Sequence, residues 1–295
     1  MDVRRIETKA SKTADLTCAC RAISSLEKDI LLKSDDWVAP LLLPRKFQLI
    51  LKSEFLRARL AQICGPKGMY AWVVARTKYI DDWFVGIARE GFKQVLILGA
   101  GFDTRAIRFA DELSGARVFE LDAGSTQIIK TTQFKARGIN LPDYVTFLPV
   151  NFELETITEK LKKAGFRTDL KTLIVMEGVL QYIRPGAVRA TLSSLSQLTP
   201  PGSRLICDFA NASFFQTEVD VYGKTGMQSI LKRYGETFQF GVAETEVEPF
   251  FDQMGFRLVE YITPPDLEQM YFKDTRGKVR ARVNGTQSII TAERY

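Results

Sequence analysis

The stretch Leu96-Ile97-Leu98-Gly99-Ala100-Gly101-Phe102-Asp103-Thr104 decides the fold. Residues 95–98 are a short apolar run, which is typical of a strand buried on both faces of a parallel sheet. The run ends in a G-x-G turn, after which Asp103 or Thr104 can cap a helix. Glycine suits such a turn because a Cβ would forbid the backbone angles or collide with a ligand over it. The stretch therefore predicts a strand, a ligand-binding turn and a helix.

The residues around this turn separate two classes of nucleotide-binding protein. A dinucleotide fingerprint needs a third glycine three residues after Gly101, but Thr104 stands there, which disfavours NAD and flavin enzymes. About twenty residues further on, the next apolar run ends in Phe119-Glu120-Leu121-Asp122, where one carboxylate could accept both hydroxyls of a ribose. The glycine turn and the acidic pair together predict a nucleoside site.

Strand-like and helix-like segments alternate after the turn. Helix-length segments at 125–137, 157–164 and 187–198 separate further strand-like runs at 117–121, 144–150, 172–176 and 204–209. This alternation predicts a doubly wound, Rossmann-like α/β sheet with helices on both faces. Two closing strands are expected at 257–262 and 287–293. Residues 211–250, which are polar and aromatic without a clear period, are interpreted as a substrate cap inserted in the C-terminal half.

The chain before the sheet has helical periodicity from about residue 11 to residue 90. Proline and glycine divide it into three or four helices, with breaks at Pro40, Pro44, Gly65, Pro66 and Gly68. No strand is expected before residue 93. We therefore expect an N-terminal helical cover over residues 1–90 and a Rossmann-like domain over residues 91–295.

Composition favours a soluble protein in the cytoplasm. The 295 residues are 45% hydrophobic and 26% charged, and no apolar stretch approaches the roughly 18 residues of a membrane span. Residues 1–10 are charged, unlike the start of a secretory signal. The net charge of +6 is spread along the chain, so neither a nucleic-acid partner nor a membrane partner is expected.

Cysteine and histidine usage narrows the chemistry. Cys18 and Cys20 form a C-x-C pair, while Cys64 and Cys207 lie far away. With no histidine in the chain, a common zinc site cannot be completed, so no metal is expected and the four thiols are interpreted as buried or idle. The same absence removes Ser-His and Cys-His nucleophile pairs, which disfavours hydrolases.

Over roughly residues 15–210 the sequence resembles the leucine carboxyl methyltransferase superfamily, whose O-methyltransferases use S-adenosylmethionine (SAM). The resemblance is carried by ordered motifs: Thr13-Ala14 with Arg21-Ala22, Ala75-Arg76-Thr77 with Asp81-Asp82, Leu98 to Arg105, Phe119 to Asp122, and Met176-Glu177-Gly178-Val179-Leu180-Gln181-Tyr182. It implies an enzyme that binds SAM on the predicted sheet.

The resemblance also implies roles for individual residues. Arg76 would hold the methionine carboxylate of SAM, as a planar guanidinium can. Glu177 would lie beside the methionine amino group. Asp122 would bind the ribose, with Glu120 on the same strand face as the alternative.

The remaining expected cofactor contacts are the turn residues Gly99, Gly101 and Asp103, and the pair Asn151-Phe152 at the adenine. The family usually has Asp-Leu at the adenine, so an amide oxygen would replace a carboxylate there. Four further charged residues in the N-terminal region are interpreted as salt-bridge partners, with substrate binding as the alternative: Arg21, Asp35, Asp36 and Asp82.

The implied reaction is direct in-line methyl transfer to oxygen, and no catalytic residue is predicted because positioning does most of the work. A carboxylate acceptor arrives ionised, so the lack of histidine favours it over a hydroxyl. The acceptor is expected to be a small molecule, with a protein C-terminus as an alternative. An NAD-dependent oxidoreductase and a SAM-binding protein without turnover are the competing hypotheses.

Overall fold

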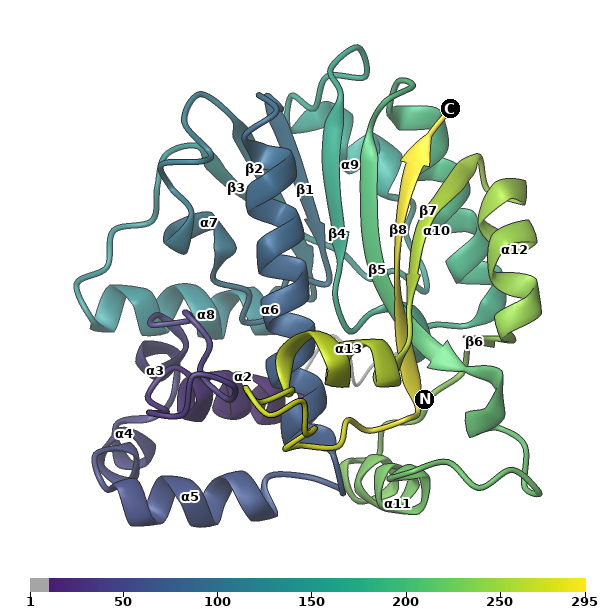
Figure 1. Ribbon diagram of the computed structural model, residues 1–295. Helices are drawn as coiled ribbons and strands as arrows, with labels where there is room; N and C mark the ends of the chain where they lie inside the picture. Colours follow the sequence, from purple (N-terminus) through teal and green to yellow (C-terminus); the bar gives the residue numbers. More distant parts are fainter. Residues whose placement is uncertain (1–10) are drawn as a thin grey trace.

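The computed structural model describes residues 11–295, so residues 1–10 and the expectation about a secretory leader lie outside the described part. An eight-stranded sheet runs through the molecule in the order β3-β2-β1-β4-β5-β8-β7, and the short β6 pairs with β5 (Figure 1). The strands are β1 Gln94–Leu98, β2 Arg117–Asp122, β3 Val145–Pro149, β4 Thr172–Met176, β5 Arg204–Asn211, β6 Gly241–Val242, β7 Phe256–Ile262 and β8 Gln287–Arg294.

The pairing of the strands confirms the predicted Rossmann-like sheet. Strands β1 to β5 are mutually parallel. Strand β8 runs antiparallel to β5 and β7. The chain proceeds outward from β1 to β3 and then returns to place β4 on the other side of β1. Such a reversal opens a crevice at the carboxyl ends of the parallel strands, where ligands bind in open α/β sheets.

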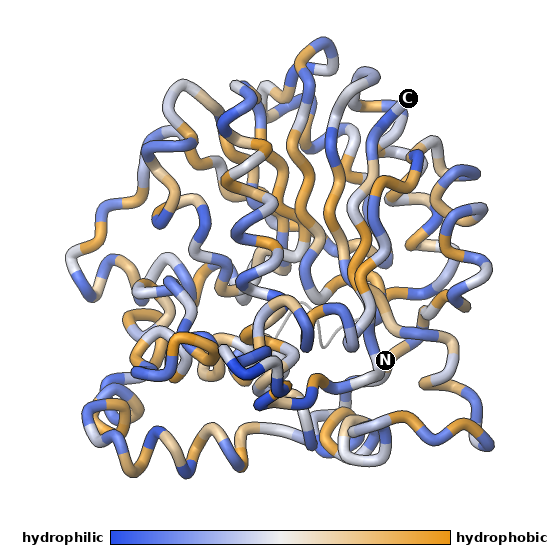
Figure 2. The backbone as a smooth tube through the Cα atoms, in the orientation of Figure 1, coloured by the Kyte–Doolittle hydropathy of each residue, from blue (hydrophilic) through white to orange (hydrophobic). Residues whose placement is uncertain are grey.

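Helices cover both faces of the sheet. On one face lie α6 (Met69–Ala88), α7 (Arg105–Arg108) and α13 (Pro264–Tyr271), and on the other lie α9 (Ile157–Lys163), α10 (Pro185–Leu198) and α12 (Val247–Gln253). Helix α8 (Gly124–Ala136) follows β2. The central strands form continuous apolar ribbons because both of their faces are buried (Figure 2).

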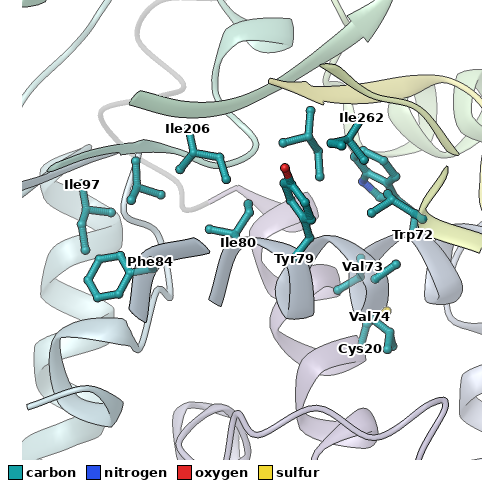
Figure 3. Packing of buried hydrophobic residues seen from close by; sticks show 14 of the residues in the cluster. Cys20, Trp72, Val73, Val74, Tyr79, Ile80, Phe84, Ile97, Ile206 and Ile262 are labelled. Atoms are coloured by element: carbon teal, nitrogen blue, oxygen red, sulfur yellow. The ribbon is translucent and has the colours of Figure 1, made fainter. Parts of the chain in front are cut away.

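Helix α6 shares its core with the sheet. Trp72, Ile80 and Phe84 are fully buried and belong to one cluster with Ile97 and Ile206 (Figure 3). The helices that precede it, α2 (Lys12–Ser24), α3 (Ala39–Leu42), α4 (Arg45–Leu51) and α5 (Glu54–Ile63), lie together with α11 (Lys224–Tyr234) beyond the carboxyl ends of the parallel strands (Figure 1). These helices therefore cover the end of the sheet at which the parallel strands have their carboxyl ends.

Two regions differ from the expected elements. The described chain before β1 has five helices instead of three or four, because Ser53 caps α5 and separates it from α4 by accepting a hydrogen bond from the Leu56 N–H. The segment 211–250 contains helix α11 and the sheet strand β6. Between residues 11 and 295, no helix has the length and apolar character needed to span a membrane.

Candidate functional site

A pocket opens at the carboxyl ends of β1, β2 and β4. The space between its lining residues is about 1350 Å³ when the open mouth is included. Seven of the nine residues predicted as cofactor contacts line it: Arg76, Gly99, Gly101, Asp122, Asn151, Phe152 and Glu177. The other two, Asp103 and Glu120, are not in its lining.

The glycine turn after β1 forms one wall. Gly99 and Gly101 have φ values of +62° and +48°, in the left-handed region that favours glycine. Asp122, at the end of β2, accepts hydrogen bonds from the backbone N–H groups of Gly101 and Ala123, both at 2.6 Å. Thr126 also hydrogen-bonds to this carboxylate, and a carboxylate with about four acceptor positions keeps capacity for a further donor. The turn and Asp122 thus form one rigid polar wall.

Two features of the structure favour glycine at position 99: its positive φ and the close approach of a neighbouring side chain. A Cβ at this position would lie 2.2 Å from Cγ2 of Val179, in the loop after β4. We expect Gly99→Ala to lower the free energy of unfolding by about 2–4 kcal/mol, through backbone strain and overpacking together. Chemical denaturation measures the loss.

Gly138→Ala is the matched control for the Gly99 substitution. Gly138 has a similar φ of +68°, but nothing lies within 4 Å of the added Cβ. Its loss of stability should therefore contain only the backbone contribution. Equal losses in the two variants would show that the contact with Val179 costs nothing.

Arg76 lies between two carboxylates at the base of the pocket. Its Nη1 is 2.7 Å from Oδ2 of Asp208 on β5, and its Nη2 is 3.0 Å from Oε1 of Glu177, directly after β4. Oε2 of Glu177 is 2.8 Å from Nη1 of Arg105. Burial raises the pKa of Glu177, but Arg76 and Arg105 outweigh burial and bring the pKa down to about 2. Glu177 is therefore ionised at neutral pH.

Asp208 is fully buried, and its carboxylate joins several elements of the site. Besides Arg76, it accepts from the Gly178 N–H at 2.5 Å, from Gln287 Nε2 on β8 at 3.3 Å and from Gln181 Nε2 at 3.5 Å. A buried charge needs such partners, because unpaired it would cost several kcal/mol. Asp208 thereby fixes Arg76 and the loop after β4.

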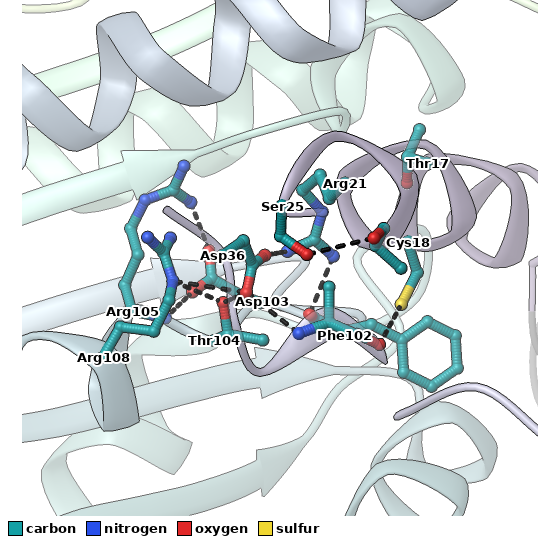
Figure 4. A network of polar contacts seen from close by, with 12 residues as sticks. Thr17, Cys18, Arg21, Ser25, Asp36, Phe102, Asp103, Thr104, Arg105 and Arg108 are labelled. Atoms are coloured by element: carbon teal, nitrogen blue, oxygen red, sulfur yellow. Dashed lines mark hydrogen bonds and ion pairs between the residues drawn. The ribbon is translucent and has the colours of Figure 1, made fainter. Parts of the chain in front are cut away.

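A second polar network holds the N-terminal helices on the glycine turn (Figure 4). Arg21 of α2 pairs with the buried Asp36 at 2.5 Å and donates to the Phe102 carbonyl at 2.8 Å. Asp103 accepts from the Arg105 N–H at 2.7 Å and also pairs with the Arg105 side chain. Asp103 therefore shapes the turn from outside the pocket, and Arg21 and Asp36 form the expected salt bridge.

The two other expected salt-bridge residues, Asp35 and Asp82, behave differently. Asp35 is exposed, and Asp82 accepts a hydrogen bond from the Tyr271 hydroxyl at 2.8 Å. Neither belongs to the pocket lining among the described residues.

Glu120 is engaged away from the pocket. It is buried on β2 with its Oε2 2.5 Å from Nζ of Lys130 on α8. Burial raises the pKa of Glu120 to about 7, against the opposing effect of Lys130. Of the two carboxylates considered for the ribose, only Asp122 lines the pocket.

Asn151 and Phe152 follow β3 and line the pocket beside Asp122. The Asn151 side-chain oxygen accepts from the Glu153 N–H at 3.1 Å, and Phe152 is half-buried. An aromatic ring beside a hydrogen-bonding amide is a surface on which a planar base can stack.

Another part of the lining comes from the start of α2 and from Glu236, which follows α11. Glu236 accepts from Ser11 Oγ at 3.1 Å and from the Lys12 N–H at 3.0 Å, and it also accepts from the Thr13 hydroxyl. These contacts hold Thr13 and Ala14 against the pocket. They join residues more than 220 positions apart in the sequence.

The charge of the lining is mainly negative. Among the described lining residues, Arg76 is the single cation, and the carboxylates are Asp122, Glu153, Glu177 and Glu236. Such a pocket suits a ligand with more positive than negative groups, and it would repel a diphosphate.

Comparisons with known proteins agree with this geometry. The family model of leucine carboxyl methyltransferase matches residues 14–196, more than half of the chain. The chain is 25% identical to YktD of Bacillus subtilis (strain 168), a protein named as a SAM-dependent methyltransferase, over 93% of this chain and 95% of YktD. The chain belongs to the leucine carboxyl methyltransferase family. It is a SAM-dependent methyltransferase.

Two solved structures share the fold over nearly the whole chain. A protein of the DUF574 family from Streptomyces avermitilis has a TM-score of 0.61 at 15% identity, covering 99% of this chain and 100% of its own. A structure described as a methyltransferase from Thermobifida fusca has a TM-score of 0.60 at 17% identity, covering 97% of this chain and 95% of its own. At this identity the likeness is one of fold.

Proposed function

We propose that the protein transfers the SAM methyl group to an oxygen of a small-molecule acceptor, a carboxylate in the first instance. SAM supplies an activated methyl group on a sulfonium, so the chain has to bind, orient and exclude water. The observation that carries the assignment is the arrangement of Arg76, Glu177 and Asp122 around one pocket.

The proposed cofactor contacts follow from the charges and free positions in this pocket. Arg76 would hold the methionine carboxylate. Its guanidinium has five N–H groups, and its ion pairs with Glu177 and Asp208 do not use all of them. Glu177, ionised at neutral pH, would attract the ammonium. Asp122 would accept the ribose hydroxyls, and Asn151 and Phe152 would contact the adenine.

The acceptor would enter between α2 and the segment 211–250. We propose this segment as the substrate cap, and the helices between residues 11 and 90 as the N-terminal helical cover. Met227 of α11 and Met69 of α6 line the pocket there, beside Glu236 and Tyr182. A chain without histidine has no ordinary general base near neutral pH, which favours a carboxylate. A hydroxyl acceptor is the second candidate. Glu236 favours it, because the carboxylate of Glu236 would repel the carboxylate of an acidic acceptor.

The pH dependence of turnover distinguishes the two acceptors. With a panel of carboxylic acids and phenols and saturating SAM, we expect transfer to a carboxylic acid at a rate that changes less than twofold between about pH 6 and pH 8, because the acid is ionised throughout. Formation of S-adenosylhomocysteine reports the rate. A phenol acceptor with a rate rising nearly tenfold per pH unit would instead establish the hydroxyl reaction.

Calorimetric titration with SAM, S-adenosylhomocysteine and NAD precedes the acceptor panel. We expect saturable binding of both sulfur compounds and none of NAD. SAM could also bind without methyl transfer to any acceptor of the panel or to the C-terminal carboxylate of a protein. That result would support a SAM-binding protein without turnover and would count against the proposal.

A further inference from the structure

Two cysteines that are 44 positions apart meet beside the pocket wall. Sγ of Cys20, in the middle of α2, lies 3.2 Å from Sγ of Cys64, the residue that ends α5. A disulfide bond is about 2.05 Å long, so the sulfurs need to approach by roughly 1 Å. Cys18, two residues earlier on α2, points elsewhere, with its Sγ 3.7 Å from the Ala39 carbonyl.

The surroundings of Cys64 allow such an approach. Cys64 lies between the end of α5 and Gly65, Pro66 and Gly68, which precede α6. Gly65 and Gly68 both have positive φ, as expected of a connection between helices instead of a regular element. The Cys20 side, by contrast, is fixed: Cys20 is fully buried against Val74 of α6 (Figure 3).

We propose that Cys20 and Cys64 are a site of oxidative modification, at which a hydroperoxide forms an intramolecular disulfide. The exposure of the two thiols assigns their roles. Cys64 is partly exposed and can meet the oxidant, whereas Cys20 has no exposed surface and can react only with Cys64. The hydrogen bond with Cys20 also lowers the pKa of the Cys64 thiol, which favours its nucleophilic thiolate form.

The reaction balances in two steps. The Cys64 sulfur attacks one hydroperoxide oxygen, an S–O bond forms, the O–O bond breaks, and the leaving oxygen takes the thiol proton as an alcohol or water. The Cys20 sulfur then attacks the sulfenic acid, an S–S bond forms, and the hydroxide leaves as water with the Cys20 proton. Each sulfur loses one electron, and the hydroperoxide gains two.

The bond would tie together two walls of the pocket. Helix α2 brings Thr13 and Ala14 to the lining, and the connection after Cys64 leads to Met69 and Arg76 on α6. The proposal does not depend on the acceptor or on the proposed oxygen chemistry.

Mass spectrometry tests the proposal on the full chain. After hydrogen peroxide treatment without reductant, we expect the monomer mass to fall by about 2 Da, because two hydrogens are lost, and a non-reduced peptide map to link Cys20 with Cys64. Cys18→Ala, on the same helix, should form the bond as the wild type does. Persistence of both free thiols, or a bond that includes Cys18 or joins two chains, would overturn the proposal.

The single variants test the assigned roles even if the disulfide is short-lived. In Cys20→Ser, which keeps a hydrogen-bonding side chain beside Cys64 but has no thiol to attack a sulfenic acid, Cys64 should accumulate as a sulfenic acid that dimedone labels. In Cys64→Ala, Cys20 should remain unlabelled. Equal labelling of the two cysteines would show that Cys64 is not the residue that meets the oxidant.

Discussion

Replacing Asp122 with alanine is expected to weaken SAM binding about 100-fold, because the proposed ribose contacts are bonds to a charged acceptor worth roughly 1.5–3 kcal/mol each. The substitution also leaves the N–H groups of Gly101 and Ala123 without the acceptor they have in the folded chain. The glycine turn should therefore loosen as well. Calorimetric titration gives the change in affinity directly.

The control for Asp122 is the other carboxylate of the same strand face. The double variant Glu120→Leu, Lys130→Met replaces both partners of a buried ion pair with apolar residues. Such a replacement is often neutral for stability. Because Glu120 lies outside the pocket lining, this double variant should bind SAM within about threefold of the wild type. A large loss in the double variant with little loss in Asp122→Ala would reverse the assignment of the ribose ligand.

Arg76→Ala is expected to weaken SAM binding by more than tenfold, since the cofactor carboxylate would lose its only cation among the described lining residues. It should also lower the free energy of unfolding by about 3–5 kcal/mol, because the buried Asp208 would lose its ion pair. Binding is therefore measured by calorimetry well below the unfolding transition, which denaturation locates for each variant.

Arg108→Ala separates the two effects. The Arg108 side chain is buried like that of Arg76 and pairs with two carboxylates, Asp81 at 2.7 Å and Asp36 at 3.4 Å, but Arg108 does not line the pocket. We expect this variant to lose stability while its affinity for SAM stays near that of the wild type. Equal losses of affinity in both variants would mean that Arg76 acts only through stability.

Much of the fold was predictable, because short apolar runs that alternate with helix-length segments are compatible with few folds other than a parallel α/β sheet. Residues 173–176 are all apolar, and the strand predicted at 172–176 is β4 with the same bounds. The glycine turn and the acidic end of β2 predicted which strand ends would meet, since adjacent parallel strands end at one edge of the sheet. Helix α11 was missed, although Gly223 and Gly235 bracket it and both take left-handed angles.

Among the residues of the pocket, the sequence indicated mainly those that lie at or directly after the end of a strand. Asp208 could have been noticed, because a carboxylate within the apolar run Leu205 to Phe209 needs a buried partner. Glu236 offered no such signal, since its partners Ser11 and Thr13 lie more than 220 positions away. Likewise, the sequence alone could not separate Glu120 from Asp122, because Lys130 meets Glu120 only through the packing of α8 on β2.

The central carboxylate of Asp208 also has a consequence for biosynthesis. Gln287, one of its partners, belongs to β8, which is the latest strand in the sequence and yet inserts between β5 and β7. Since a ribosome delivers residues in order, the nascent chain can align β1 to β5 while Asp208 still lacks that amide and the sheet is open along β5. We therefore expect the binding pocket to be complete only after β8 has emerged and paired with β5.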